Sequence, residues 1–195
     1  MEKLRLLFTA VFLFCIVASV QAQQKYEIID NTGFLVLKGT SNSSDWQLKS
    51  NELEGDAQFV VADDELKSLS RVIVNIDANT IGNEENKRMT RKAHKTLLVS
   101  DHPIVTFFAY GFSQAGNGPK KIKGSVYLGG KNVDILFDFI YRAQDEIMWI
   151  VAEADAKFSD FGLEPPTDFG GLVQCNDEIK IEVQLPFAMP TDSGK

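Results

Sequence analysis

Residues 131–142 read KNVDILFDFIYR, and this stretch decides the fold. Every second residue from Val133 to Tyr141 is apolar, and the row between them carries Asp134 and Asp138. Residues 178–187, EIKIEVQLPF, alternate in the same way. A period of two sends successive side chains to opposite faces of a β-strand. Both stretches are therefore predicted to be strands with one apolar face.

The same period recurs outward from these two stretches, in shorter runs at residues 35–38, 57–61 and 72–76. Turn residues separate the runs, and Gly129-Gly130 is a two-residue hairpin signal between residues 121–128 and 131–142. Further turns are predicted at Asn31-Thr32-Gly33, at residues 116–118 and at Asn176-Asp177. About eight strands result. The expected fold is all-β with one inserted helix, an eight-stranded antiparallel β-barrel that encloses side chains or one ligand.

The inserted helix is the one segment that departs from the period of two. Asn83 is predicted to cap it, and Pro103 is predicted to stop it. An apolar stripe is formed by Met89, Ala93 and Leu97, and a basic face by Lys87, Arg88, Arg91, Lys92 and Lys95. The basic face is either a solvated helix surface or a docking surface for an anionic head group or membrane.

Residues 1–22 have the composition of a signal peptide. Lys3 and Arg5 precede an apolar run from Leu6 to Val20, and Val20-Gln21-Ala22 supplies the small residues that a signal peptidase reads. The run is too short for a comfortable membrane span, and no later run reaches spanning length. We therefore predict cleavage after Ala22, one domain at residues 23–195, no stable membrane span and a periplasmic or secreted location.

Charge and cysteine content narrow the range of partners. The chain has 20 basic and 27 acidic residues; loss of Lys3, Arg5 and Glu2 leaves 18 and 26, a net charge of −8. Such a surface repels phosphate backbones, so no nucleic-acid partner is expected. Cys175 is then the single cysteine, which excludes an internal disulfide. Its thiol is predicted to be buried, with a homodimer linked through it as the alternative.

Residue constellations typical of enzymes and metal sites are sparse. His94 and His102 are eight residues apart, which fits neither a helical ligand pair nor a zinc cluster, so no metal site is predicted. Acidic pairs lie at residues 52 and 54, 63 and 64, and 145 and 146, near expected turns. We predict no catalytic residue. The alternative kept open is a secreted enzyme that acts on a lipid or glycan through carboxylates at a barrel mouth.

The chain is rich in large apolar side chains, with fourteen phenylalanines among its residues. Phe107, Phe108, Tyr110 and Phe112 place aromatic rings on both faces of one strand. One row is expected to face inward and the other to lie under the helix. As a set, the aromatic residues fit either a filled barrel or one lined for an apolar guest.

Three segments carry a family resemblance: residues 35–46, from Leu35 to Trp46; residues 83–107, which end in Pro103-Ile104-Val105-Thr106-Phe107; and residues 160–179, with Asp160-Phe161-Gly162-Leu163 and Pro165-Pro166-Thr167. In this order they resemble the YceI-like family of polyisoprenoid-binding periplasmic proteins with a lipocalin-like fold. The chain departs from the family pattern at Ser44, where histidine is expected, and at His94, where leucine is expected.

The resemblance implies a lipocalin-like barrel with a long apolar tunnel that holds an isoprenoid tail or a similar lipid. No cofactor is required. The ligand-binding residues expected on the matched strands and helix are Leu35, Leu37, Trp46, Phe59, Val61, Val74, Ile76, Met89, Ala93, Leu97, Val105, Phe107, Phe137, Phe139, Phe158, Ile181 and Val183. A register error of one residue would send a whole row to the other face.

The leading hypothesis is thus an exported protein that carries or sequesters a long apolar molecule, isoprenoid or fatty acyl. Besides the enzyme already described, a third hypothesis is a structural or stress protein whose barrel is filled by its own phenylalanines. An interior with no cavity would favour that third hypothesis.

Overall fold

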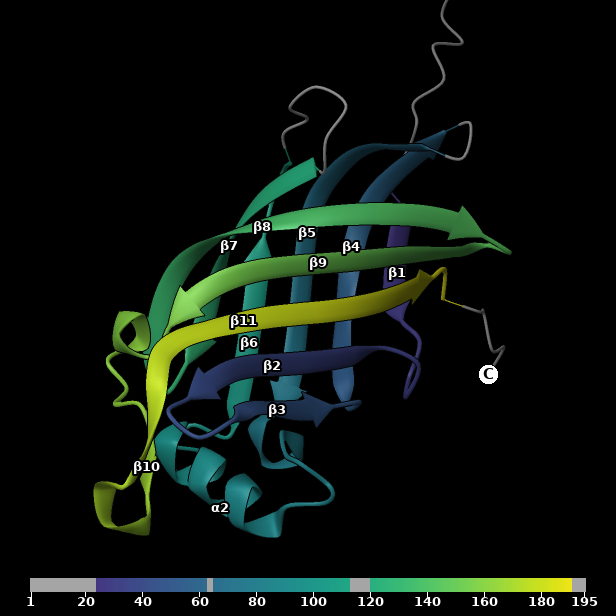
Figure 1. Ribbon diagram of the computed structural model, residues 1–195. Helices are drawn as coiled ribbons and strands as arrows, with labels where there is room; N and C mark the ends of the chain where they lie inside the picture. The colour runs from purple at the N-terminus through teal and green to yellow at the C-terminus, as the bar shows by residue number, and fades with distance from the viewer. Residues whose placement is uncertain (1–23, 63–64, 113–119, 191–195) are drawn as a thin grey trace, which may run out of the picture.

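A computed structural model describes residues 24–62, 65–112 and 120–190 (Figure 1). The predicted signal peptide and the predicted turn at residues 116–118 lie outside these residues. The strands are β1 (Gln24–Ile28), β2 (Phe34–Ser41), β3 (Asp45–Ser50), β4 (Leu53–Ala62), β5 (Glu65–Asp77), β6 (Ile104–Ala109), β7 (Lys120–Leu128), β8 (Lys131–Gln144), β9 (Ile147–Lys157), β10 (Thr167–Asp168) and β11 (Val173–Ala188). The helices are α2 (Lys87–Thr96) and three short 3-10 turns, η1 (Ala78–Thr80), η2 (Ser159–Phe161) and η3 (Phe169–Gly171).

Eight antiparallel strands form a closed ring in the order β1-β4-β5-β6-β7-β8-β9-β11, and pairing of β11 with β1 closes it. The all-β prediction with one inserted helix and an eight-stranded ring is therefore confirmed. The β2–β3 hairpin is added outside the ring, because β2 pairs with the part of β11 that precedes its contact with β1. In Figure 1, α2 and β10 lie side by side at one end of the molecule, below β2 and β3.

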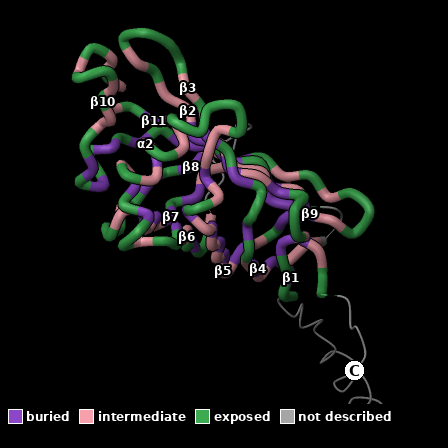
Figure 2. The backbone as a smooth tube through the Cα atoms, turned by 90° about the horizontal axis from the view of Figure 1, so that it is seen from below, coloured by how far each residue is buried: buried purple, intermediate pink, exposed green. Residues whose placement is uncertain are grey.

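The hairpin predicted at Gly129-Gly130 joins β7 to β8, and both glycines have positive φ, 58° and 87°. Mirror-image two-residue turns need such angles, which glycine adopts without a steric penalty. The hairpin sets the register of β8, so that its row from Val133 to Tyr141 faces inward. Figure 2 shows buried positions alternating with more exposed ones along the strands.

The helix is shorter than the sequence pattern predicts at both ends. Its N-cap is Asn86, whose side chain accepts a hydrogen bond from the Met89 N–H, whereas Asn83 forms a turn three residues earlier. Pro103 does not stop the helix. Leu98 does, with φ 55°, and the N–H groups of Leu98 and Val99 donate to the Lys95 and His94 carbonyls. This is the Schellman arrangement, with leucine where glycine is usual.

Two further predictions about the surface of the sheet are wrong. Asn176-Asp177 does not end a strand; it lies within β11, at a register irregularity between Cys175 and Ile179 that bends the strand. Phe108 and Tyr110 do not lie under the helix, because their side chains are 37% and 71% exposed. Phe107, in the other row of β6, packs against the core, and so does Phe112, which lies beyond the end of the strand.

One end of the ring is filled by aromatic side chains. The Phe59 ring is 1% exposed and contacts Tyr26 and Phe187, with ring centroids 5.1 and 5.3 Å away. The contact with Phe187 is edge-to-face, a favourable geometry for two aromatic quadrupoles. We call these three residues the aromatic plug. Among residues 24–62, 65–112 and 120–190, no helix combines the length and apolarity that a membrane span needs.

Candidate ligand-binding site

An inner cavity of about 90 Å³ lies in the middle of the ring. Its described lining is entirely apolar and comes from seven strands and the residue after η1. The lining residues are Leu35, Leu37, Leu69, Val72, Val74, Ile76, Ile81, Val105, Phe107, Ile122, Val126, Leu128, Phe137, Phe139, Ile150, Ala152, Ile179, Ile181, Val183, Leu185 and Phe187. A space of this kind offers nothing to a polar guest, since every polar group placed there would lose its hydrogen bonds.

The inner cavity exists because some inward-facing positions of the sheet have a small side chain or none. On β9 the inward row runs from Met148 to Ala156 and ends in three buried alanines, of which Ala152 lines the inner cavity and contributes a single methyl group. On β7, Gly124 has no side chain, and a Cβ there would stand 2.1 Å from the Phe107 ring. Phe107 therefore lies across Gly124 and packs edge-to-face on Phe137, at 5.1 Å. The small residues decide where the large rings can lie.

An outer cavity of about 230 Å³ lies between α2, β2, β3 and the segment around β10. Its lining mixes apolar and polar side chains: Leu37, Ser41, Ser44, Trp46, Leu48, Asn86, Arg88, Met89, Lys92, Ala93, Thr96, Leu97, Leu128, Phe158, Pro166, Thr167, Asp168, Phe169, Val173, Cys175 and Ile179. Leu37, Leu128 and Ile179 line both cavities. The two spaces are thus neighbours with a shared apolar wall.

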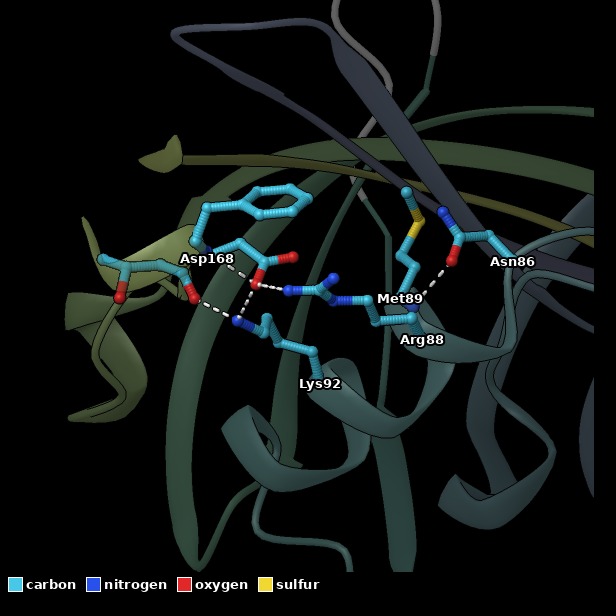
Figure 3. Close-up of polar contacts among 7 residues, drawn as sticks. Asn86, Arg88, Met89, Lys92 and Asp168 are labelled. Atoms are coloured by element: carbon cyan, nitrogen blue, oxygen red, sulfur yellow. Dashed lines mark hydrogen bonds and ion pairs between the residues drawn. The ribbon is translucent and has the colours of Figure 1, made fainter. Parts of the chain in front are cut away.

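Charged side chains gather at the rim of the outer cavity (Figure 3). Oδ1 of Asp168 accepts from Arg88 Nη2 at 2.6 Å and from Lys92 Nζ at 2.9 Å. The hydrogen bonds from Lys92 and from the Phe169 N–H, helped by Arg88, lower the pKa of the Asp168 carboxyl to about 2. Arg88 also lies over the Phe169 ring, 4.3 Å from its centroid. We call Arg88, Lys92 and Asp168 the charged rim.

Trp46 belongs to the apolar part of the lining of the outer cavity. Its indole covers Gly39, where a Cβ would stand 2.2 Å from the ring, and lies 6.1 Å from the Phe158 ring. Its Nε1–H donates to the Thr40 carbonyl at 3.2 Å. Cys175 lines the same cavity and is half-buried, and burial raises the pKa of its thiol. Trp46 and Cys175 can therefore serve as intrinsic probes of ligand binding in the outer cavity.

Fifteen of the seventeen residues predicted to bind ligand line one of the two cavities. Those on the inner cavity are Leu35, Leu37, Val74, Ile76, Val105, Phe107, Phe137, Phe139, Ile181 and Val183, and those on the outer one are Trp46, Met89, Ala93, Leu97, Phe158 and again Leu37. Phe59 and Val61 line neither, because Phe59 belongs to the aromatic plug and Val61 packs only partly buried against the core. The role of the fifteen in binding stays a prediction.

Sequence reasoning missed lining residues of two kinds. Ile179, Leu185 and Phe187 belong to the same alternating row as Ile181 and Val183, so the period of two was sufficient to find them. The charged rim is different. Asp168 contacts Arg88 and Lys92, which lie about eighty residues earlier in the chain, and no local sequence pattern predicts that contact.

The two histidines make structural contacts. His94 Nε2 lies 2.8 Å from the Ile81 carbonyl oxygen, and His102 Nδ1 lies 2.9 Å from the Tyr127 hydroxyl. Within the part of the chain that the structure describes, no three His, Cys, Asp or Glu side chains gather in a group suited to a metal ion.

The family model of the YceI-like domain matches residues 29–187. The chain belongs to the YceI-like family. Among solved structures, this YceI-like chain is similar to BcnA of Burkholderia cenocepacia, with 13% identity over 82% of this chain and 98% of that one and a TM-score of 0.63. It is also similar to a polyisoprenoid-binding domain from Saccharophagus degradans implicated in plant cell wall breakdown (13% identity, 85% and 98% covered, TM-score 0.60).

A YceI protein of Campylobacter jejuni is a third neighbour, with 17% identity over 69% of this chain and 80% of that chain and a TM-score of 0.52. At these identities the likenesses concern the fold. No curated protein gives a significant match to this chain.

Proposed function

We propose that this YceI-like protein binds one long, narrow apolar molecule, an isoprenoid or fatty acyl chain, and carries or sequesters it. The observation that carries the proposal is the inner cavity, whose described lining is wholly apolar. The Saccharophagus neighbour, named for polyisoprenoid binding, points to the same class of ligand. The lining offers no polar group to orient a reacting substrate, so the site is suited to holding a chain.

The energetics of chain burial are sufficient for this function. Each buried methylene contributes about 0.8 kcal/mol, so ten contribute roughly 8 kcal/mol, against an association cost of about 4 kcal/mol or more. The cavities are small for a ligand site, since typical pockets measure roughly 300–1,000 Å³. A thin, flexible chain fits this interior better than a fused ring system does.

We further propose that the protein is exported and acts in the periplasm or outside the cell. The apolar run and small residues of positions 6–22 support cleavage after Ala22. An apolar cargo needs a carrier in an aqueous compartment, where its free concentration is very low.

The alternative of a carboxylate-dependent enzyme lacks a suitable acid at the cavities. Among the described lining residues of the two cavities, the one carboxylate is Asp168. Its pKa is lowered to about 2, whereas a general acid at neutral pH needs a raised pKa. The pairs Glu52 with Glu54 and Asp145 with Glu146 are exposed, and neither lines the inner or the outer cavity.

The alternative of a ligand-free barrel filled by its own phenylalanines accounts for one end only. The aromatic plug fills that end, but Phe107, Phe137 and Phe139 leave a space beside them. A protein selected only for stability would gain from filling such a space, because an empty cavity costs free energy.

Organic extraction of the purified protein, followed by mass spectrometry, tests the proposal. We expect a prenyl or acyl chain in near-equimolar amount. Ile179→Trp places an indole at the wall shared by both cavities and should abolish the extracted lipid. Val151→Trp, on the exposed face of β9, adds the same bulk outside and should retain it. No lipid from the wild type, even after incubation with dodecanoic acid or geranylgeraniol, would refute the proposal.

A further inference from the structure

The charged rim gathers three N–H donors around one oxygen atom. Oδ1 of Asp168 accepts from Arg88, Lys92 and the Phe169 backbone at 2.6, 2.9 and 2.9 Å. Lys92 also donates to the Thr167 carbonyl, which holds its ammonium at this place. Converging donors of this kind are the arrangement with which proteins bind carboxylate and phosphate oxygens. Asp168 thus occupies the position that an anionic group of a ligand would take.

The charge balance at the rim is positive. Arg88 and Lys92 share a single carboxylate, and both cations lie in the described lining of the outer cavity. The helix that carries them, α2, contains five Lys or Arg and no acidic residue, although the whole chain has a net charge of −7. A second anion therefore meets attraction at this rim, while most of the protein surface repels it.

The outer cavity also connects the rim with the apolar interior. Beneath the charged groups, its lining is apolar, with Met89, Leu97 and Phe158, and ends at the wall shared with the inner cavity. An amphiphile with its head at Arg88 and Lys92 places its tail among these side chains. The aromatic plug occupies the other end of the ring, so a head at Arg88 and Lys92 directs the tail from the outer cavity toward the plug.

From this geometry we infer that the charged rim is a head-group site for amphiphiles with an anionic head, a carboxylate or a phosphate, bound by Arg88 and Lys92. Asp168 holds both cations in place before the ligand arrives and competes with its head. The Phe169 ring, stacked on Arg88, covers the guanidinium from the solvent side and keeps its N–H groups directed to the anion. The inference deepens the proposed function and rests on it.

The test compares ligands that share a tail and differ in head charge. The Trp149→Phe variant leaves Trp46, in the wall of the outer cavity, as the single reporter. Delipidated protein is titrated with dodecanoate and dodecanol, and with geranylgeranyl phosphate and geranylgeraniol. We expect each anionic ligand to bind about tenfold more tightly than its alcohol, since charge-assisted hydrogen bonds are the stronger ones. The fatty and prenyl pairs separate the two sources of such heads.

Three variants, made in the same single-tryptophan background, test which residues cause the preference for the anionic ligands. Arg88→Gln with Lys92→Gln should make acid and alcohol bind equally, with the alcohol unaffected. Arg91→Gln with Lys95→Gln removes the same charge from exposed positions of α2 and should retain the preference. Asp168→Asn removes the competing carboxylate and should tighten binding of the anionic ligands about threefold or more.

Equal binding of acid and alcohol by the wild type would overturn the head-group site and leave the apolar carrier intact. Loss of the preference in the Arg91/Lys95 control would overturn it as well, because general attraction by the helix would then explain the preference. Weaker binding of the acids by Asp168→Asn would exclude competition by Asp168. Failure of all four ligands to bind would overturn the carrier itself.

Discussion

The two ends of the interior are built from the same kinds of residue and differ in what those residues enclose. At one end, the Phe59 ring packs against the rings of Tyr26 and Phe187 and is buried. At the other end, Trp46 and Phe158, whose ring centroids are 6.1 Å apart, line an outer cavity of about 230 Å³. The strand β11 connects the two ends, from Cys175 to Phe187.

The comparison teaches that aromatic content alone does not decide whether a barrel is filled. The filled end has a large ring opposite another large ring. In the middle of the ring, Ala152 on β9 lies opposite Phe139 on β8, and Gly124 on β7 lies under the Phe107 ring, so that small side chains face large ones and leave space. The small residues create the space, whereas the large ones at the plug pack closely and stabilise the fold.

The largest expected effect is a loss of stability at the filled end. Phe59→Ala should lower the free energy of unfolding by about 3–5 kcal/mol, because it opens a cavity around a side chain that is 1% exposed. Met89→Ala, at the half-buried wall of the outer cavity, should cost about 1 kcal/mol. Urea denaturation of both variants measures the difference. Equal losses would mean that the two ends are packed alike.

A smaller effect is expected between the two ends, at Gly124. Gly124→Ala places a methyl group 2.1 Å from the Phe107 ring and should cost about 1–3 kcal/mol through overpacking. Phe107→Leu in the same chain should restore most of that loss, because the shorter side chain vacates the contact. A double-mutant cycle in urea gives the coupling. Additive losses would show that the position of the Phe107 side chain does not depend on Gly124.

At the hollow end, ligand should change the reactivity of Cys175. Burial raises the pKa of this thiol, so at pH 8 it should react with N-ethylmaleimide more slowly than a free cysteine. Bound dodecanoate should slow the reaction further, about threefold or more, since Cys175 lines the outer cavity. Thiol labelling followed by mass spectrometry measures both rates. An unchanged rate at saturating ligand would place the ligand elsewhere.

The smallest expected effect is the acid response of the charged rim. The pKa of Asp168 is lowered from 3.8 to about 2, so its contribution to stability is complete above pH 3.8 and is lost as the pH falls toward 2. Asp168→Asn should therefore have a slightly lower Tm than the wild type at pH 6, and the gap should close near pH 2. Thermal scans at several pH values measure it. A gap that widens on acidification would contradict this sign.

How much of the site can be predicted from the sequence depends on whether local periodicity or contacts between distant segments position each residue. The period of two fixes the inward face of β2, β5, β8 and β11, so Leu35, Val74 and Phe137 could be assigned to the interior. The period does not say how far along the ring a residue lies. Phe59 is inward as predicted, but it lies at the plug, and its place depends on Tyr26 and Phe187 across the ring.

The helix shows a second limit. Its apolar stripe follows from spacing, and Met89, Ala93 and Leu97 do line the outer cavity. Its end at Leu98 does not follow, since a leucine with positive φ carries no composition signal. The contact between α2 and Asp168 depends on how the bent β11 brings β10 back to the helix, which is a property of the finished fold.

The seam that closes the ring joins the first and last described strands and consists of two residue pairs, Glu27 with Ala188 and Ile28 with Phe187. During folding, the chain therefore exposes an unfinished sheet edge until β11 pairs with β1. β11 supplies partners to β1, β2, β9 and β10 at once. Assembly of the sheet thus depends on β11, which has 16 residues. A truncation within β11 should produce a chain that aggregates instead of a slightly smaller barrel.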